Sequence, residues 1–350
     1  MTLPIEFPSP PRQILIIKPS SLGDVVHTLP VLRLLRRRFP ESHIAWLVAP
    51  HCAGLLQNHP DLNEVILFDR RRFGSAWHNP KALLSLYQFH RDLRRHQFDL
   101  TIDLQGLFRS GWLSWQTGAP IRLGLANARE LGWMFYTHRV PIETTEIHAV
   151  DRYLKLAAAV GCATEPVEFH FTVTDADRAY VKDLIGDADR RYAVLLPGAN
   201  WPTKRWPAER FAELVGPLSA RFGLQSVVAG GSDAAELAPR ISQALNLTNR
   251  TTVPQLVALL ESADLVIAND SGPMHIAAAL NRPLVAVFGP TNPVRTGPYA
   301  HAECVVRAMD KSVDECAPCY QKNCKHNRCL RQLHIEPVLR AIHRQLGIRG

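Results

Sequence analysis

Short runs of aliphatic and β-branched residues alternate with amphipathic stretches of helical length along this 350-residue chain. Such alternation is typical of βα units wound around a mostly parallel sheet. Together the elements of the first series predict one doubly wound domain. In chain order they are a strand at 14–18, a helix at 24–38, strands at 44–49 and 65–69, a helix at 80–95 and a strand at 100–104.

The same pattern restarts after a turn-rich passage at residues 161–166, which follows a helical segment at 149–160. A last helix at 335–346 could pack on either half. We therefore predict an α/β protein of two doubly wound, Rossmann-like domains, residues 1–165 and 166–350, that face a central cleft where ligands of open sheets bind. The second series comprises strands at 192–196, 226–229, 265–268 and 284–288, and helices at 207–222, 233–245 and 254–262.

Composition and charge narrow the choice of partners. No apolar run approaches the roughly 18 to 20 residues that span a bilayer, and the start of the chain has no secretory apolar core. The net charge of +8 comes from short basic clusters at 36–38, 70–72 and 94–95, and no nucleic-acid motif accompanies them. These features predict a cytoplasmic protein whose partner is an anionic substrate or an anionic membrane surface. Solvated helix ends would produce the same clusters.

A polar turn at residues 269–275, with the sequence NDSGPMH, follows a buried strand and leads into a helix that begins near Pro273. Free backbone N–H groups and the positive end of the helix dipole make such a helix start a ready site for phosphate. Gly272 allows a ligand to approach closely, and Ser271 can cap the helix or donate to an oxygen. An ordinary capped turn would use the same residue types, so the turn alone leaves both interpretations open.

A second strand-ending turn in the same domain carries two cations, Lys204 and Arg205, beside Ala199 and Asn200. Lysine and arginine can neutralise a diphosphate. One turn rich in free N–H groups and one rich in cations jointly favour a diphosphate site over coincidence. A third turn presents Ser232, and it is either a tight structural turn or a contact to ribose or phosphate.

The opening strand ends in a small-residue loop that contains Ser21, Gly23 and Asp24 and lacks the spacing of a Walker phosphate loop. This loop should place the Asp24 carboxylate at the cleft. A sugar hydroxyl that attacks an anomeric carbon needs a general base, and an aspartate is competent if desolvation raises its pKa. Alternatively, Asp24 caps its own helix by accepting hydrogen bonds from Val26 or His27.

A comparable turn follows the strand at 100–104 and offers Gln105, Arg109 and Ser110 to the same cleft. The Arg109 guanidinium is well shaped for a carboxylate or a phosphate on an acceptor. A solvated surface arginine is the alternative.

Four segments taken together resemble the ADP-heptose:lipopolysaccharide heptosyltransferase family, glycosyltransferase family 9. They are residues 18–30, 103–110, 204–207 and 269–275. The resemblance implies a GT-B fold, with an acceptor-binding first domain and an ADP-sugar-binding second domain. It also implies inverting, metal-independent transfer of a heptose to a lipopolysaccharide inner-core or similar glycolipid acceptor, with no cofactor besides the donor and with peripheral contact to the inner membrane surface.

The same resemblance assigns roles to individual residues. Asp24 matches the proposed base and Lys204 the lysine that neutralises the diphosphate. Ser271 stands where family members can carry threonine and keeps the hydroxyl. Ala199 and Asn200 stand where some members carry a threonine pair, which leaves the donor sugar open. The residues that match the donor-binding turn are Asp270, Ser271, Gly272 and His275.

Four of the seven cysteines lie close together before the last helix, at Cys316, Cys319, Cys324 and Cys329. Four thiols in so short a segment could hold a tetrahedral structural zinc. The spacing differs from that of paired C-x2-C motifs, and reduced, packed or oxidised thiols would fit it equally. A catalytic metal is disfavoured because the cluster lies outside the predicted turns.

Two further functions stay open at this point. A sugar-nucleotide epimerase or hydrolase would use the same two-domain fold and would consume the donor without an acceptor. A non-catalytic nucleotide- or lipid-binding module would bind the donor without turnover. The presence of Asp24 and Lys204 in opposite domains favours a glycosyltransferase.

Overall fold

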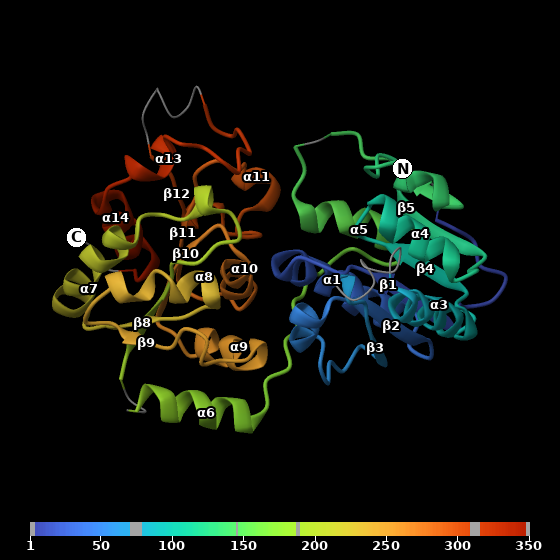
Figure 1. Ribbon diagram of the computed structural model, residues 1–350, viewed down its shortest axis with the longest axis horizontal. Coiled ribbons are helices and arrows are strands. Elements are labelled where there is room, and N and C mark those ends of the chain that lie inside the picture. The colour runs from blue at the N-terminus through green and yellow to red at the C-terminus, as the bar shows by residue number, and fades with distance from the viewer. Residues whose placement is uncertain (1–3, 71–78, 145, 187–189, 309–315, 348–350) are drawn as a thin grey trace. The chain divides into compact units, whose positions relative to one another are not determined.

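Each half of the chain builds its own parallel, six-stranded sheet (Figure 1). The computed structural model describes residues 4–70, 79–144, 146–186, 190–308 and 316–347, so Arg71 and Arg72 of the basic cluster at 70–72 lie outside the described residues. The chain divides into two units, Met1–Thr172 and Val173–Gly350. The predicted α/β class with two doubly wound domains is confirmed.

In the first unit the strands are parallel and lie in the order β3-β2-β1-β4-β5-β6. The register pairs Ile17 of β1 with Leu47 of β2 and with Asp103 of β4, so the carboxyl ends of the central strands lie side by side. Any side chain that directly follows these strands is therefore brought to one edge of the sheet. The strands are β1 (Gln13–Ile17), β2 (His43–Val48), β3 (Glu64–Leu67), β4 (Leu100–Asp103), β5 (Ile121–Leu125) and β6 (His138–Val140).

Helices cover both faces of this sheet. α3 and α4 contact each other and pack on the face that carries Leu15 and Ile17. α1 and α5 contact each other on the other side of the sheet (Figure 1). Right-handed crossovers place α1 and α3 on opposite faces, because α1 connects β1 to β2 and α3 leads in the opposite direction along the sheet, from β3 to β4. The helical segments are α1 (Leu22–Arg38), η1 (Pro50–Leu55), α3 (Pro80–Arg95), α4 (Phe108–Gln116), η2 (Gly132–Phe135) and α5 (Ala149–Ala159).

The second unit repeats this plan with the strand order β12-β11-β10-β7-β8-β9. β10 lies at its centre, where Leu265 pairs with Ala193 of β7 and Val266 with Leu284 of β11. The strands are β7 (Tyr192–Leu196), β8 (Gln225–Val228), β9 (Leu245–Asn246), β10 (Leu265–Asn269), β11 (Leu284–Val287) and β12 (Val305–Val306). The helices that surround them are α6 (Asp175–Ile185), α7 (Ala208–Phe222), α9 (Val253–Glu261), α10 (Gly272–Ala279) and α14 (Ile335–Gln345).

The predicted helix at 233–245 is wrong. Helix α8 (Ser232–Ala235) ends after one turn, a short 3-10 turn η4 (Ala238–Arg240) follows, and Leu245 already belongs to β9. Pro239 explains the break, because proline has no N–H to donate and its ring disfavours a helical conformation at the preceding residue.

The last helix, α14, packs in the second unit, where it contacts β11, β12 and α7. Its apolar stripe, which includes Val338 and Ile342, is fully buried. A hydrogen bond from Trp206 Nε1 to the Leu333 carbonyl, 2.8 Å long, connects the segment before α14 to the loop that follows β7. The structure therefore decides the question that the sequence left open for this helix.

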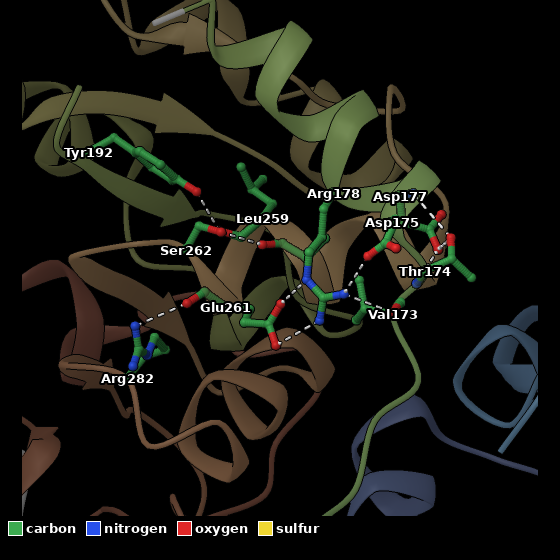
Figure 2. Close-up of polar contacts among 11 residues, drawn as sticks. Val173, Thr174, Asp175, Asp177, Arg178, Tyr192, Leu259, Glu261, Ser262 and Arg282 are labelled. Carbon is green, nitrogen blue, oxygen red and sulfur yellow. Dashed lines mark hydrogen bonds and ion pairs between the residues drawn. The ribbon is translucent and has the colours of Figure 1, made fainter. Parts of the chain in front are cut away.

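A polar network joins α6 to α9 at the start of the second unit (Figure 2). The Arg178 guanidinium donates to both carboxylate oxygens of Glu261, over 3.0 and 3.3 Å. Arg282 donates to the Glu261 carbonyl over 3.0 Å, and the Tyr192 hydroxyl donates to the Leu259 carbonyl over 2.8 Å. These contacts fix the end of the helix that leads into β10, the strand whose carboxyl end carries the polar turn.

Candidate functional site

Asn269, the last residue of β10, is fully buried and holds two chain segments together. Its side-chain nitrogen donates to the Pro197 carbonyl over 2.7 Å, and its side-chain oxygen accepts from the Trp206 backbone N–H over 3.1 Å. The loop between these two residues carries Lys204. Asn269 therefore clamps the cationic turn against the end of β10, a structural role that the sequence pattern did not show.

Lys204 and Asp270 form a short ion pair at this edge of the second sheet. The Lys204 Nζ lies 2.6 Å from Asp270 Oδ2, and the Thr291 hydroxyl donates to the same oxygen over 2.6 Å. The Asp270 side chain is 4% exposed and that of Lys204 18% exposed. The lysine ammonium also lies 4.7 Å from the ring centroid of Trp201. The carboxylate is thus enclosed, whereas the cation keeps access to solvent.

Ser271 begins α10 without capping it. It has extended backbone geometry at the N-cap position, and its side chain makes no cap hydrogen bond. Among the described residues, its hydroxyl oxygen is buried without a hydrogen-bond partner. A buried hydroxyl without a partner costs about 1–3 kcal/mol. Gly272 is the first helical residue, and the first-turn N–H groups of an α-helix have no acceptor within the helix. This helix start suits an anionic oxygen.

The other predicted donor residues lie around the same edge. Ala199 is buried, and its carbonyl accepts from Arg205 Nε over 2.9 Å. Asn200 and Ser232 are exposed, with Ser232 at the start of α8, and His275 is buried inside α10. The structure therefore brings Lys204, Asp270 and Ser271 together and leaves Asn200 and Ser232 on the surface.

Thr291 is a member of this cluster that the sequence did not single out. It follows β11 and is 2% exposed. The signal was available, because the segment Gly289-Pro290-Thr291 is one more strand-ending turn with a hydroxyl.

At the carboxyl edge of the first sheet, Asp24 lies in the first turn of α1. Its Oδ2 accepts from the Ser21 backbone N–H over 3.0 Å and from the Ser21 hydroxyl over 2.8 Å. Its Oδ1 lies 3.3 Å from Lys18 Nζ and accepts from the Tyr153 hydroxyl over 3.2 Å. Asp24 therefore does cap α1, but through Ser21 rather than through Val26 or His27.

Lys18 is the buried centre of this second cluster. Its side chain is 2% exposed, while that of Asp24 is 36% exposed. Its ammonium donates to the Leu104 carbonyl over 3.0 Å and to the Tyr153 hydroxyl over 2.7 Å. Lys18 thus ties the ends of β1 and β4 to α5. The sequence contained Lys18 in a motif, but Tyr153 lies 129 residues from Asp24 and only tertiary packing brings it near.

The condition stated for Asp24 as a base, a pKa raised by desolvation, is not met. Burial does push the pKa upward, but the Lys18 charge, the Ser21 hydrogen bonds and the His27 charge outweigh it, and they hold the pKa well below its ordinary value. The reason is that a carboxylate beside a buried cation is stabilised in its charged form. Asp24 is therefore ionised at neutral pH.

The turn after β4 is built by Asp103, which is fully buried. Its Oδ1 accepts from the backbone N–H groups of Gln105 and Gly106, over 2.8 and 3.1 Å, and its Oδ2 accepts from the Tyr136 hydroxyl over 2.6 Å. Gly106 has φ of +68°, a conformation that favours glycine. Among the described residues, the Gln105 side-chain oxygen is buried without a hydrogen-bond partner. This turn is rigid and presents an unused acceptor.

Arg109 lies in the first turn of α4 and is exposed. Partial burial and the nearby charge of Arg70 lower the pKa of its guanidinium. Two arginines that interact repulsively are stabilised by an anion between them. Gly23, the remaining predicted acceptor residue, is buried in α1 next to Asp24.

The four clustered cysteines influence one another. Burial and the neighbouring thiols of Cys316, Cys319 and Cys324 raise the pKa of Cys329 to about 11. The Cys324 sulfur accepts from the Asn327 N–H over 3.3 Å, and the Cys329 thiol donates to the Asn327 side chain over 3.5 Å. A structural zinc on these thiols stays a prediction.

A different trio has the spacing of metal ligands. His301, Glu303 and Cys304 offer ligand atoms that all lie within 4.8 Å of one another. His301 Nε2 is 3.1 Å from the Asn281 side-chain oxygen, and its Nδ1 is 3.4 Å from Glu303. The three residues belong to the 3-10 turn η5 (Ala302–Cys304) and to His301, the residue before it.

Known proteins match this arrangement along most of the chain. The family model for glycosyltransferase family 9 (heptosyltransferase) matches residues 86–329. The chain belongs to glycosyltransferase family 9. It is 32% identical to lipopolysaccharide heptosyltransferase 1 of Pseudomonas aeruginosa over 324 residues, which cover 90% of this chain and 88% of the relative. It is 30% identical to lipopolysaccharide heptosyltransferase 1 of Escherichia coli K12, over 85% of this chain and 93% of that protein.

Solved structures of family 9 members have the same architecture. The Escherichia coli heptosyltransferase WaaC with ADP matches with a TM-score of 0.77 and 27% identity, over 95% of this chain and 99% of that one. The Escherichia coli ADP-heptose lps heptosyltransferase II matches with a TM-score of 0.75 and 27% identity, over 95% and 98%. The chain is thus a glycosyltransferase with the GT-B fold.

Proposed function

We propose that this glycosyltransferase moves a heptose from ADP-heptose to a lipopolysaccharide inner-core or similar glycolipid acceptor, with inversion at the anomeric carbon and without a metal ion. Relatives at about 30% identity are named lipopolysaccharide heptosyltransferases. Structural neighbours were solved with ADP and with ADP-2-deoxy-2-fluoro heptose. One observation carries the donor half of the proposal. The Ser271 hydroxyl, next in the chain after Asp270 of the Lys204–Asp270 pair, is buried and has no hydrogen-bond partner among the residues that the structure describes.

The donor diphosphate would bind at the start of α10. An oxygen of the diphosphate supplies the partner that the Ser271 hydroxyl lacks among the described residues, and the helix N-terminus favours its negative charge. Lys204, held near Asp270 but open to solvent, can shift its hydrogen bond to the phosphate. Because charge on the diphosphate grows as the glycosidic bond breaks, this cation stabilises the transition state more than the ground state.

Asp24 would receive the acceptor proton. In a single displacement the acceptor oxygen forms a bond to the anomeric carbon, the bond from that carbon to the diphosphate oxygen breaks, and ADP leaves with the electron pair. The acceptor hydroxyl becomes strongly acidic once its oxygen bonds to carbon, so an ionised Asp24 with a low pKa can take the proton late in the step. Lys18 and Ser21 act as positioning residues that orient the carboxylate.

The acceptor would use the edge of the first sheet. Gln105 and Arg109 lie on the turn and helix that follow β4, and Arg70 adds a second guanidinium. A guanidinium pair of this kind recognises a carboxylate or phosphate, the anionic groups of a glycolipid core. Ser21 and Gly23 support the Asp24 end of the same surface.

The proposed location of the enzyme in the cell follows from its proposed glycolipid acceptor. None of the described helices is long and apolar enough to cross a membrane. We propose a cytoplasmic enzyme that reaches its glycolipid acceptor by peripheral contact with the inner membrane surface.

Transfer can be tested with purified protein, a panel of ADP-, UDP- and GDP-sugars and a lipopolysaccharide-core acceptor, with product identified by mass spectrometry. We expect product from the ADP-heptose alone, with undiminished yield in EDTA and the anomeric configuration inverted by NMR. Consumption of the donor without any acceptor would instead identify an epimerase or hydrolase. Donor binding without turnover on every acceptor would identify a binding module.

A further inference from the structure

Exposed large apolar side chains are concentrated in one stretch of the first unit. Among the described residues, eight such side chains fall between residues 67 and 134, whereas the second unit has three. Scattered single apolar residues are normal on a surface, whereas apolar side chains that lie next to one another mark an interaction site. The eight are Leu67, Leu83, Leu84, Tyr87, Phe108, Trp115, Leu131 and Met134, and the three are Tyr180, Val294 and Tyr320.

Helix α3 contributes the densest part of this set. Ala82 and Leu93 bury one face of α3. Leu83, Leu84 and Tyr87 lie on the opposite face, 56%, 57% and 63% exposed. Helical spacing of three and four residues places these three side chains next to one another. An amphipathic helix of a water-soluble protein normally turns its apolar face to the core, so this outward apolar face is unusual.

The same outward face of α3 becomes basic toward its end. Tyr87 is followed at helical spacing by Arg91 and Arg94, with Arg95 beside them. All three arginines are exposed. Asp92 is the acidic neighbour, 3.2 Å from Arg95 and 3.7 Å from Arg91, and it leaves the segment with a net positive charge.

These arginines line a hollow of about 640 Å³ between the end of α3 and the turn before β5, together with Thr117, Gly118 and Pro120. Gly118, whose φ of +73° favours glycine, lies next to the Arg94 guanidinium in this hollow. Asp99 also lines the hollow, and its Oδ2 accepts from the backbone N–H groups of Arg12 and Gln13. Three guanidinium groups against one carboxylate leave the lining with a net positive charge that suits a phosphate.

We propose that the outward face of α3, with Trp115 of the adjoining α4, docks on an anionic lipid bilayer. Leu83, Leu84 and Tyr87 insert among the lipid headgroups, and the arginines bind lipid phosphates in the hollow. The inference rests on the proposed function, because this surface would bring the enzyme to its glycolipid acceptor. The binding itself is independent of catalysis.

The charge on this face of α3 favours a lipid bilayer over a second copy of the chain as its binding partner. A two-fold contact through α3 would place arginines opposite arginines if the helices ran parallel, or arginines opposite Leu83 and Leu84 if they ran antiparallel. Either arrangement leaves buried charge uncompensated. An anionic bilayer offers acyl and headgroup layers that match the apolar and basic ends together.

Sedimentation with vesicles tests the proposal on the full chain. The probe is a vesicle of phosphatidylethanolamine and phosphatidylglycerol, compared with one of phosphatidylcholine alone and with added inorganic phosphate as competitor. We expect binding to the anionic vesicle, weak binding to phosphatidylcholine, and little competition by free phosphate. Equal binding to both vesicles, or complete competition by phosphate, would overturn an anionic-bilayer site.

Two triple variants separate the halves of the surface. Leu83→Ser with Leu84→Ser and Tyr87→Ser, or Arg91→Gln with Arg94→Gln and Arg95→Gln, should each weaken anionic-vesicle binding roughly 100-fold, about fivefold for each residue. At high salt the arginine variant and the wild type should bind the anionic vesicle equally, because the charge interactions are screened. The apolar variant should still bind more weakly than the wild type. Vesicle binding unchanged in both variants contradicts the proposal.

Matched controls come from the second unit. Tyr180→Ser with Val294→Ser tests exposed apolar residues in general, and Arg221→Gln with Arg240→Gln and Arg250→Gln tests exposed arginines in general. Neither should change vesicle binding by more than about twofold. A loss as large as that of the α3 variants would show that binding is nonspecific and contradict the proposal.

Transfer to a water-soluble acceptor fragment, free of acyl chains, reports folding and catalysis for every variant and should stay within about twofold of wild type. If wild-type protein binds vesicles but transfers no heptose, the proposed function fails and the docking surface stands. If size-exclusion chromatography shows a dimer that the apolar variant dissociates, the occupant is a second copy and the bilayer proposal is wrong.

Discussion

Both units pair a lysine with an aspartate at the carboxyl edge of a sheet, but they pair them in opposite senses. In the first unit the lysine is enclosed, since Lys18 is 2% exposed and Asp24 36% exposed. In the second unit the carboxylate is enclosed, since Asp270 is 4% exposed and Lys204 18% exposed. The first edge therefore exposes an anion and the second exposes a cation. In the proposed function the exposed anion is the proton acceptor and the exposed cation binds the diphosphate.

The buried partner is stabilised in each case by additional hydrogen bonds. Lys18 donates to the Leu104 carbonyl and the Tyr153 hydroxyl, and Asp270 accepts from the Thr291 hydroxyl. A buried ion pair stabilises a fold only if such bonds offset its desolvation. Both clusters meet this condition, so the exposed partner of each is held in place and still keeps access to solvent.

The largest effect should come from the exposed anion. Asp24→Asn removes the proton acceptor while keeping a hydrogen-bond acceptor for Ser21, and we expect kcat to fall about 10³-fold. The matched control is Asp177→Asn, because Asp177 Oδ2 accepts from the backbone N–H and hydroxyl of Thr174 at the start of α6, over 3.1 and 2.6 Å. If Asp24 only caps its helix, Asp24→Asn and Asp177→Asn should both be less stable than the wild type and should both keep their activity in steady-state assays.

The exposed cation should rank second. Lys204→Ala removes the charge that offsets the departing diphosphate, and we expect kcat to fall about 10²-fold or more. Lys322→Ala is the control, because the Lys322 ammonium lies 5.0 Å from the same Trp201 ring. Steady-state kinetics with ADP-heptose should separate the two, and equal losses would point to the ring environment rather than to a specific clamp.

Asp24, Lys204 and Asp270 were singled out in the sequence because each lies in the turn between a hydrophobic strand and the next helix, at the edge where parallel strands end. Tyr153 and Thr291 were not singled out. Tyr153 approaches Asp24 only because α5 packs on α1, and Thr291 approaches Asp270 only because β11 lies next to β10. Contacts of this kind join residues that are far apart in the sequence, so no local sequence pattern predicts them.

The fold shows the same limit. Strands with long aliphatic runs, such as β1 and β10, were predicted within a residue or so of their observed bounds. β5 was missed because Arg122 and Gly124 interrupt its apolar run, and β6 because it has three residues, His138–Val140. α6 was missed because its charged face hides its helical period, and tertiary bonds to α9 hold it. Short or charged elements are fixed by their neighbours rather than by their own pattern.

A third, smaller effect tests the buried cation. Lys18→Met leaves Asp24 without its compensating charge, so burial should raise the Asp24 pKa. We expect the acidic limb of the pH–rate profile to move to higher pH and kcat at neutral pH to fall roughly tenfold. Tyr153→Phe, which removes the hydroxyl that accepts from Lys18 and donates to Asp24 but removes no charge, should move the limb less. An unchanged limb would contradict the positioning role of Lys18.

Stability should change with pH in a defined direction for the same variant. In the wild type the Asp24 pKa is depressed, so its stabilisation is complete above the ordinary aspartate pKa of about 4 and is lost as pH falls through the folded-state value. Lys18→Met should therefore cost about 2 kcal/mol at neutral pH, less than for a fully buried pair because Asp24 is 36% exposed. Urea unfolding should show this difference shrinking below pH 4.

The smallest effect is expected for Ser271, at the edge of the second sheet where the donor would bind. Ser271→Ala removes a buried hydroxyl that has no partner among the described residues, so the ligand-free protein should lose no stability and can gain up to about 1 kcal/mol. ADP binding should weaken about fivefold to tenfold, since one hydrogen bond to a phosphate is lost. Thermal melting and calorimetric titration with ADP measure the two changes separately.

Ser262→Ala is the control, because the Ser262 hydroxyl donates to the Ala258 carbonyl inside α9, away from the edge. Lower stability with unchanged ADP affinity in Ser271→Ala would make Ser271 a structural residue and leave Lys204 as the sole side chain that binds the diphosphate at this edge.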